Sequence, residues 1–294
     1  MNVEILENEA KYNEFQKSLN LIEFGNIEIQ IKSITSLEPI PEVSIDIFQN
    51  KLNCDKDLIL IIDPILSLKI KEKGELKIND LEFGDYTILL RKKNFLTNCA
   101  NIIVSKRNEV VTKFLAPELK EKQVGLLIEW NNPKVMIDLH AKFIDDKVNN
   151  CAVGYEFKHC GGMQFYFTNQ TDILASYIVI NLREYSYLFY LQNRESLKSN
   201  ELKNTDLFYS NVKISYYLFE DEFPSVFMDS LTLPNQKEWA NVMGSKNLAY
   251  LLGCLKPKTN NDELIPLKKT FWIDQYYERN DKDLPNAEIC NLNI

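Results

Sequence analysis

Apolar and polar residues alternate along short segments of this chain, and this alternation limits its possible folds more than any other feature. After Gly25, three isoleucines at Ile27, Ile29 and Ile31 are separated by polar residues. A period of two places successive side chains on opposite faces of a strand, so one face is buried and the other is solvated. Further runs of this kind follow at intervals typical of a β-sandwich. The longer candidates are 43–47, 58–62, 73–81, 84–90, 110–115, 124–130, 137–143, 164–167, 176–182, 185–192, 212–219, 224–233 and 271–277.

The chain has 294 residues, which suggests about two domains. Its 14 Tyr and 16 Phe also favour sheet, because aromatic side chains fit a half-buried pleated surface. A Pro-containing boundary and the charged segment Lys120–Lys122 separate two sets of strands. We therefore predict an all-β fold of two tandem β-sandwich modules, over 25–118 and 123–294, the second with loop insertions. Residues 1–24 are predicted to be an N-terminal arm or short helix, and Lys237–Leu252 is the other segment with a helical period.

The first module resembles the carboxypeptidase-regulatory-like (prealbumin-like) β-sandwich family. The resemblance lies in Gly25 with its alternating strand, in Pro39–Ile45, and in Gly74–Tyr86 with its ending Leu81-x-x-Gly84-x-Tyr86. It covers about 90 residues and is a pattern of strands more than a signature. The family has no catalytic residues of its own, so the resemblance implies none here.

The second module resembles the YfaP-like sandwich domains. The matching segment has a strand ending at Trp130, a Pro turn, and a strand bearing Asp138-x-His140. Pro133 stands one place early, and Met136 occupies the position where the family usually has its first Asp. Domains of this family are often found directly behind a prealbumin-like module, which is the order seen in this chain.

Trp130, Asp138 and His140 are the first candidate binding residues. Alternation places Asp138 and His140 on one face of a strand, where they could hold a cation or another ligand. The alternative is structural, with Asp138 bonded to turn amides and His140 bonded at the sheet rim. Because Met136 removes an oxygen ligand, we favour the structural interpretation and predict no metal.

Tyr185 and Tyr187 are the second candidates, in a tyrosine-rich strand. With Tyr190, Tyr216 and Tyr217, they could form a stacking platform for a sugar. Aromatic residues also dominate cores and the anchors of protein interfaces. We therefore favour packing and partner contact over carbohydrate binding.

Six scattered cysteines are predicted to be reduced thiols, buried as small hydrophobes. A zinc site made of Cys151, His159 and Cys160 with His140 is disfavoured. The reason is that His159 and Cys160 are adjacent, and adjacent residues on a strand point to opposite faces. With acidic residues and no apolar core in the N-terminal segment, we expect a cytoplasmic protein.

The net charge of −8 disfavours nucleic acid as a partner. The longest apolar runs are too short to span a membrane. Two histidines and the lack of an assembled catalytic motif argue against an enzyme. We therefore expect a non-catalytic structural or adaptor protein without a cofactor, bound to a protein partner in a larger assembly that could be cytoskeletal or ciliary. The alternatives are a carbohydrate- or ligand-binding module and, third, a hydrolase.

Overall fold

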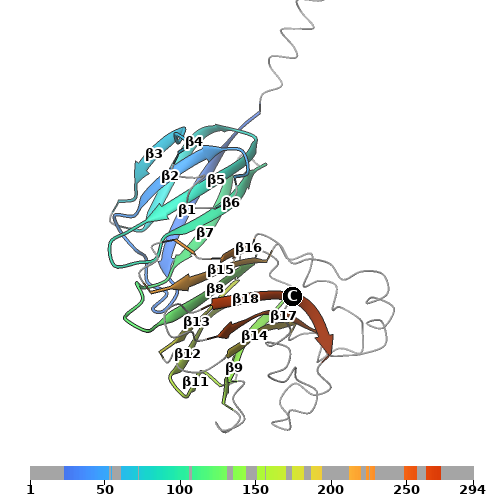
Figure 1. The fold of residues 1–294 in the computed structure, drawn as a ribbon. Helices are drawn as coiled ribbons and strands as arrows, with labels where there is room; N and C mark the ends of the chain where they lie inside the picture. The colour runs from blue at the N-terminus through green and yellow to red at the C-terminus, as the bar shows by residue number, and fades with distance from the viewer. Residues whose placement is uncertain are drawn as a thin grey trace, which may run out of the picture. The chain divides into compact units, whose positions relative to one another are not determined.

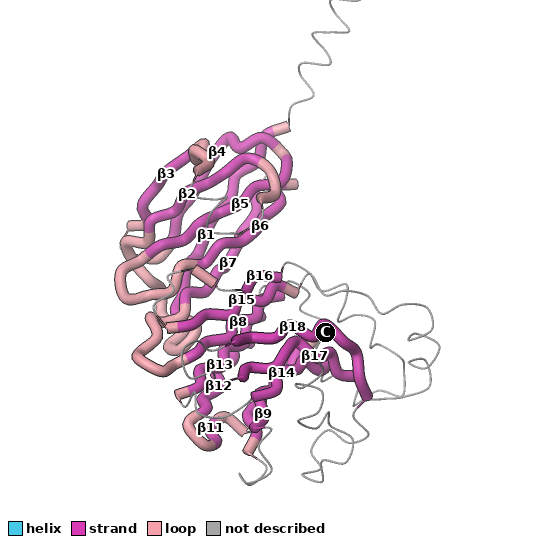
Figure 2. The backbone as a smooth tube through the Cα atoms, viewed as in Figure 1, coloured by secondary structure: helices cyan, strands magenta, loops and turns pink. Residues whose placement is uncertain are grey.

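The computed structural model of the chain is built from β-strands. It describes residues 23–52, 54, 61–71, 73–105, 108–130, 135–143, 151–155, 157–169, 174–181, 187–193, 212–219, 223–224, 226–228, 248–256 and 263–272. These residues form strands, turns and loops, and none of them is helical (Figure 2). The described part accordingly holds no helix that could cross a bilayer. The predicted all-β fold is confirmed.

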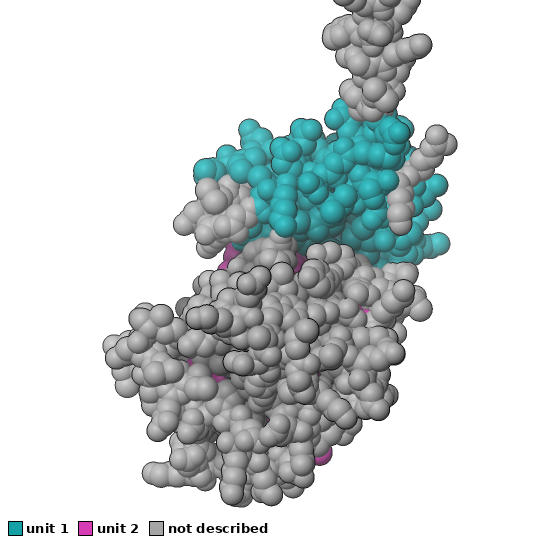
Figure 3. All heavy atoms as spheres, turned by 90° about the vertical axis from the view of Figure 1, so that its right-hand side faces the viewer, with its two compact units in different colours: residues 1–31, 39–91, 99–113 teal, residues 32–38, 92–98, 114–294 magenta. Residues whose placement is uncertain are grey.

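The chain divides into two compact units, which Figure 3 shows in two colours. Unit 1 comprises residues 1–31, 39–91 and 99–113, and unit 2 comprises residues 32–38, 92–98 and 114–294. Each unit contains two β-sheets, as a sandwich requires. The exact domain limits predicted from the sequence stay predictions.

Unit 1 is a small sandwich of a three-stranded and a four-stranded sheet (Figure 1). The three-stranded sheet has the order β4-β1-β7, and the four-stranded sheet has the order β3-β2-β5-β6. The strands are β1 (Phe24–Ser33), β2 (Ser44–Gln49), β3 (Leu66–Lys69), β4 (Glu75–Glu82), β5 (Gly84–Arg91), β6 (Asn98–Val104) and β7 (Asn108–Leu115).

Strand β1 follows the alternation that predicted it. Ile27, Ile29 and Ile31 are at most 1% exposed, while the residues between them are only half-buried. The strand therefore lies with one face on the core of unit 1. Lys77 of the neighbouring strand β4 forms an ion pair with Glu28 on the other face, with 3.2 Å between Nζ and Oε2.

Gly74, in the turn before β4, is a position where only glycine fits. Its φ is +70°, and an added Cβ would lie 2.7 Å from Pro39 Cβ and 3.2 Å from the Ile31 carbonyl oxygen. Gly74→Ala is therefore expected to destabilise unit 1 by about 1–3 kcal/mol, as overpacking and a strained backbone do. Chemical denaturation would measure the loss. Gly84→Ala is the control, because nothing lies within 4 Å of its added Cβ. Equal losses in both variants would contradict the steric argument.

Unit 2 is a larger sandwich of a five-stranded and a six-stranded sheet (Figure 1). The orders are β10-β9-β14-β17-β18 and β11-β12-β13-β8-β15-β16. The strands are β8 (Val124–Trp130), β9 (Ile137–Phe143), β10 (Ala152–Val153), β11 (His159–Cys160), β12 (Met163–Asn169), β13 (Leu174–Ile180), β14 (Tyr187–Asn193), β15 (Lys213–Leu218), β16 (Val226–Met228), β17 (Leu248–Lys256) and β18 (Glu263–Trp272).

The main core of unit 2 is built from every second residue of the facing strands. Strand β8 contributes Leu126, Ile128 and Trp130, while β9 and β14 contribute residues such as Leu139 and Phe189. The alternation in the sequence predicted that one face of each strand is buried, and these core residues confirm that buried face.

A second core covers the opposite face of β8, β13 and β15 within unit 2. It contains Leu127, Tyr177 and Tyr217 from these strands. Residues from 32–38, 92–98 and 114–119, including Phe114, pack against them. All seven residues of β8 are therefore buried, including the position of Glu129.

The helical alternative for Lys237–Leu252 is wrong for its last part, because residues 248–252 belong to β17. Residues 237–247 and 1–22 lie outside the described residues. Strand β18 begins at Glu263 and ends at Trp272, so it starts well before the predicted strand at 271–277.

Candidate functional site

Trp130 ends β8 with its indole in the main core of unit 2. Its side chain is 2% exposed, and Nε1 donates a hydrogen bond to the Val135 carbonyl oxygen at 2.8 Å. The ring lies 6.3 Å from that of Phe167, centroid to centroid. The contacts are those of a core residue whose polar atom has a partner.

Asp138 and His140 lie on the same face of β9, as the alternation predicted, and both are buried. Their closest atoms, His140 Nε2 and Asp138 Oδ2, are 3.5 Å apart. Asp138 Oδ1 accepts a hydrogen bond from the Tyr155 amide at 2.9 Å, and the His140 ring stacks on Tyr190 with 4.5 Å between centroids. A Cβ on Gly154 would lie 2.7 Å from His140 Nδ1, so the loop fits closely over the imidazole.

Burial lowers the pKa of His140, although the neighbouring Asp138 carboxylate opposes this effect. A histidine whose pKa is lowered by folding takes up its proton more readily in the unfolded chain. The stability of unit 2 is therefore expected to fall as the pH drops from about 6.5 through the lower pKa of the folded state, and this contribution levels off below it. Denaturation curves of His140→Gln across this range should show a shallower fall than those of the wild type.

His159→Gln is the matched control for this pH dependence, because His159 is exposed. It is expected to keep the wild-type slope. A His140→Gln variant with the same slope as the wild type would show that His140 is not the responsible group.

Tyr187 and Tyr190 occupy β14 and are buried. Tyr187 faces the main core with Trp130, whereas Tyr190 lies against His140 on the other side of the sheet. Tyr185 lies outside the described residues. The structure thus brings Asp138 and His140 together but separates them from Trp130 and Tyr187. A role in binding for any of these candidate residues stays a prediction.

The prediction of reduced thiols is wrong. Disulfides join Cys54 to Cys99 and Cys151 to Cys160, each with 5.7 Å between Cα atoms, and Cys254 is also disulfide-bonded. Cys151 and Cys160 are consequently not available as thiolate ligands for zinc. The described residues include no group of three His, Cys, Asp or Glu side chains placed to hold a metal.

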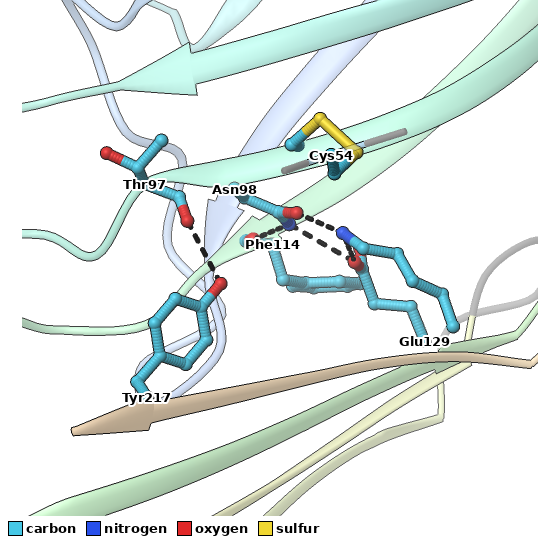
Figure 4. A network of polar contacts seen from close by, with 8 residues as sticks. Cys54, Thr97, Asn98, Phe114, Glu129 and Tyr217 are labelled. Atoms are coloured by element: carbon cyan, nitrogen blue, oxygen red, sulfur yellow. Dashed lines mark hydrogen bonds and ion pairs between the residues drawn. A yellow bond between two sulfur atoms is a disulfide. The ribbon is translucent and has the colours of Figure 1, made fainter. Parts of the chain in front are cut away.

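A buried polar network in unit 2 is the site that sequence reasoning missed. Lys213, the first residue of β15, is the register partner of Glu129 on β8. Lys213 Nζ lies 2.9 Å from Glu129 Oε2 and also contacts Asn98 Oδ1. Asn98 Nδ2 donates to Glu129 Oε2 at 3.1 Å and to the Phe114 carbonyl oxygen at 2.8 Å (Figure 4).

The network is enclosed by the second core of unit 2. Asn98, Glu129 and Lys213 are 1%, 3% and 6% exposed. Beside them, the Tyr217 hydroxyl donates to the Thr97 carbonyl oxygen at 3.0 Å (Figure 4). Burial raises the pKa of Tyr217, and the Glu129 carboxylate raises it further, so the hydroxyl keeps the proton that it donates. A sequence signal for the network was present, because Glu129 and Lys213 interrupt apolar runs.

Comparison with known proteins leaves the family of this chain unassigned. No family model matches it, and no curated protein matches it. The major pilin subunit BcpA of Bacillus cereus is 7% identical, with 88% of this chain and 97% of that chain covered and a TM-score of 0.27. A putative carbohydrate binding protein from Bacteroides uniformis is 12% identical, with 57% and 88% covered and a TM-score of 0.25.

The minor pilin GBS52 of Streptococcus agalactiae is 15% identical, with a TM-score of 0.27. It is matched over 34% of this chain, which spans about half of that protein, 48% of its length. At these TM-scores the similarities carry no argument about function.

Proposed function

We propose that this chain is a non-catalytic structural protein that binds a protein partner through one edge of unit 1. The observation that carries the proposal is an exposed apolar cluster at Ile61, Ile62 and Ile65, which are 78%, 39% and 46% exposed. The cluster directly precedes β3, an end strand of the four-stranded sheet. Exposed apolar patches mark interaction sites, and the end of a sheet can accept a strand from another chain.

The residues singled out by their chemistry support a structural role. Trp130, Asp138, His140 and Tyr187 are all buried, so none of them offers a surface to a soluble ligand. Carbohydrate stacking on Tyr187, or hydrolysis assisted by His140, therefore has no supporting observation. A protein partner at the β3 edge is the interpretation that the exposed residues favour.

We further propose that the protein works in an oxidising compartment, in place of the cytoplasm expected from the sequence. Five cysteines in disulfides support this, because disulfides persist in oxidising surroundings and are rare in the cytosol. The cytoskeletal or ciliary setting has no observation behind it. Alkylation of the denatured protein from its native source should leave Cys54, Cys99, Cys151 and Cys160 unlabelled. Labelling of most of them would contradict an oxidising location.

Site-specific photo-crosslinking tests the partner proposal. A crosslinking residue at position 62, in the protein expressed in its native source, is expected to trap one recurring partner. The triple variant Ile61→Ser, Ile62→Ser and Ile65→Ser should then bind that purified partner at least tenfold more weakly, with an unchanged melting temperature, because exposed side chains contribute little to folding.

The control is a crosslinking residue at Val110, which is 52% exposed in β7, an end strand of the other sheet of unit 1. Val110 should trap no recurring partner. The same set of crosslinked proteins at positions 62 and 110, or unaltered affinity of the triple variant, would overturn the proposal.

A further inference from the structure

We propose that Lys213 and Asn98 become joined by an intramolecular amide bond, with Glu129 transferring the protons of the reaction. The three side chains come from distant parts of the chain, and 115 residues separate Asn98 from Lys213. All three belong to unit 2. The inference is independent of the partner proposal, because the bond can form whether or not anything binds at β3.

The geometry places a nucleophile, the Lys213 amine, in contact with an electrophile, the Asn98 carboxamide. The Lys213 amine lies against the Asn98 carboxamide and contacts its Oδ1. The bond from Asn98 Nδ2 to the Phe114 carbonyl oxygen, 2.8 Å long, fixes the orientation of the carboxamide. Holding two reacting groups in contact removes much of the entropic barrier that makes amide exchange slow in solution.

Glu129 is placed to move protons between the two nitrogens. Its Oε2 lies 2.9 Å from Lys213 Nζ and 3.1 Å from Asn98 Nδ2. Only an uncharged amine can attack a carbonyl carbon, and a buried site disfavours charged groups. Transfer of one proton from the ammonium to the carboxylate converts a buried ion pair into two neutral groups. The same oxygen is within reach of the nitrogen that must leave.

The reaction balances without any other reactant. The neutral Nζ attacks Cγ of Asn98, so an Nζ–Cγ bond forms and the Cγ–Nδ2 bond breaks. The protonated Glu129 gives its proton to Nδ2 and accepts one from Nζ, so its own protonation is unchanged. Nδ2 leaves as ammonia with its two hydrogens and the added proton, and Nζ keeps one hydrogen in the new amide. No atom is oxidised or reduced.

Mass spectrometry of the full-length wild-type protein decides the proposal. After reduction and alkylation, the intact mass should be lower by one ammonia than the mass calculated for the sequence with its six cysteines alkylated. A tryptic digest should contain a branched peptide that joins the Asn98 segment to the Lys213 segment, uncut after Lys213. A cyclised asparagine would lose the same mass, so the branched peptide is the deciding observation. A full sequence mass without that peptide would overturn the proposal and leave the network as an ion pair.

Variants test the role of Glu129 separately. Glu129→Gln is expected to lose the branched peptide and to regain the full mass. Glu118→Gln, at an exposed position of the same unit, should retain the crosslink. Branched peptide in Glu129→Gln at the wild-type yield would refute proton transfer by Glu129. Because the bond can form only in the folded protein, the comparison is made on Glu129→Gln protein whose circular dichroism spectrum matches that of the wild type.

Discussion

Replacing Glu129 with alanine is expected to lower the free energy of unfolding of unit 2 by about 3–5 kcal/mol, the usual loss when one partner of a buried ion pair is removed. The substitution leaves the Lys213 amine in the core, 6% exposed, without the carboxylate 2.9 Å away. If the Lys213–Asn98 amide forms in the wild type, the loss is larger than this, because the variant then also lacks the crosslink. Tryptophan fluorescence in denaturant would measure it, since all three tryptophans belong to unit 2.

Glu118→Ala is the control, because Glu118 is an exposed acid of the same unit. Its effect should stay within about 0.5 kcal/mol, as is usual for surface substitutions. Similar losses in the two variants would show that the buried carboxylate contributes no more than an exposed one.

The double replacement Glu129→Leu with Lys213→Met shows whether the network stabilises unit 2 as an ion pair or through an amide crosslink. Replacing both members of a buried ion pair by apolar residues is often neutral or stabilising. If the network were only an ion pair, the double variant would recover most of the stability. If the amide bond forms, the double variant remains less stable than the wild type, because it loses a crosslink that constrains the unfolded chain.

The sequence could predict the strands because alternation depends on local spacing alone. Ile27, Ile29 and Ile31 face the core because every second residue of a strand does so. The same rule identified β9 and placed Asp138 and His140 on one face. Local spacing is therefore enough to predict the all-β fold class and the face of the strand on which each side chain lies.

The buried network could not be predicted because its burial is a long-range effect. Alternation assigns Glu129 to the face of β8 opposite Trp130, which would be solvated in a two-layer sandwich. That face is covered by residues 32–38, 92–98 and 114–119. None of these segments belongs to a strand of the unit 2 sandwich, and the first two are distant from β8 in the sequence. Glu129 interrupts an apolar run, but a charged residue is normally exposed, so this interruption alone did not show that its position is buried.

The disulfides were missed for a related reason. Cys54 and Cys99 are separated by 45 residues, and spacing alone does not reveal which cysteines pair. Cys151 pairs with Cys160 of β11, at a sequence separation of 9 residues. The even number of six cysteines was the available signal.

Trp130→Ala is expected to destabilise unit 2 by about 3–5 kcal/mol, the usual cost of removing a buried large aromatic side chain. The substitution opens a cavity beside Phe167 and removes the hydrogen bond to the Val135 carbonyl oxygen. Calorimetry or circular dichroism would measure the loss, because the substitution also removes a fluorescent residue. The magnitude tests the structural role directly, since a residue kept for ligand binding can be removed with little loss of stability.

Trp130→Phe distinguishes packing from hydrogen bonding at this position. Phenylalanine retains much of the apolar volume but leaves the Val135 carbonyl oxygen without the 2.8 Å bond from Nε1. A loss of about 1–3 kcal/mol is expected, because an unsatisfied buried acceptor carries a desolvation penalty. An unchanged melting temperature in Trp130→Ala would contradict the core role, and Trp130 would then have to be explained by what it binds.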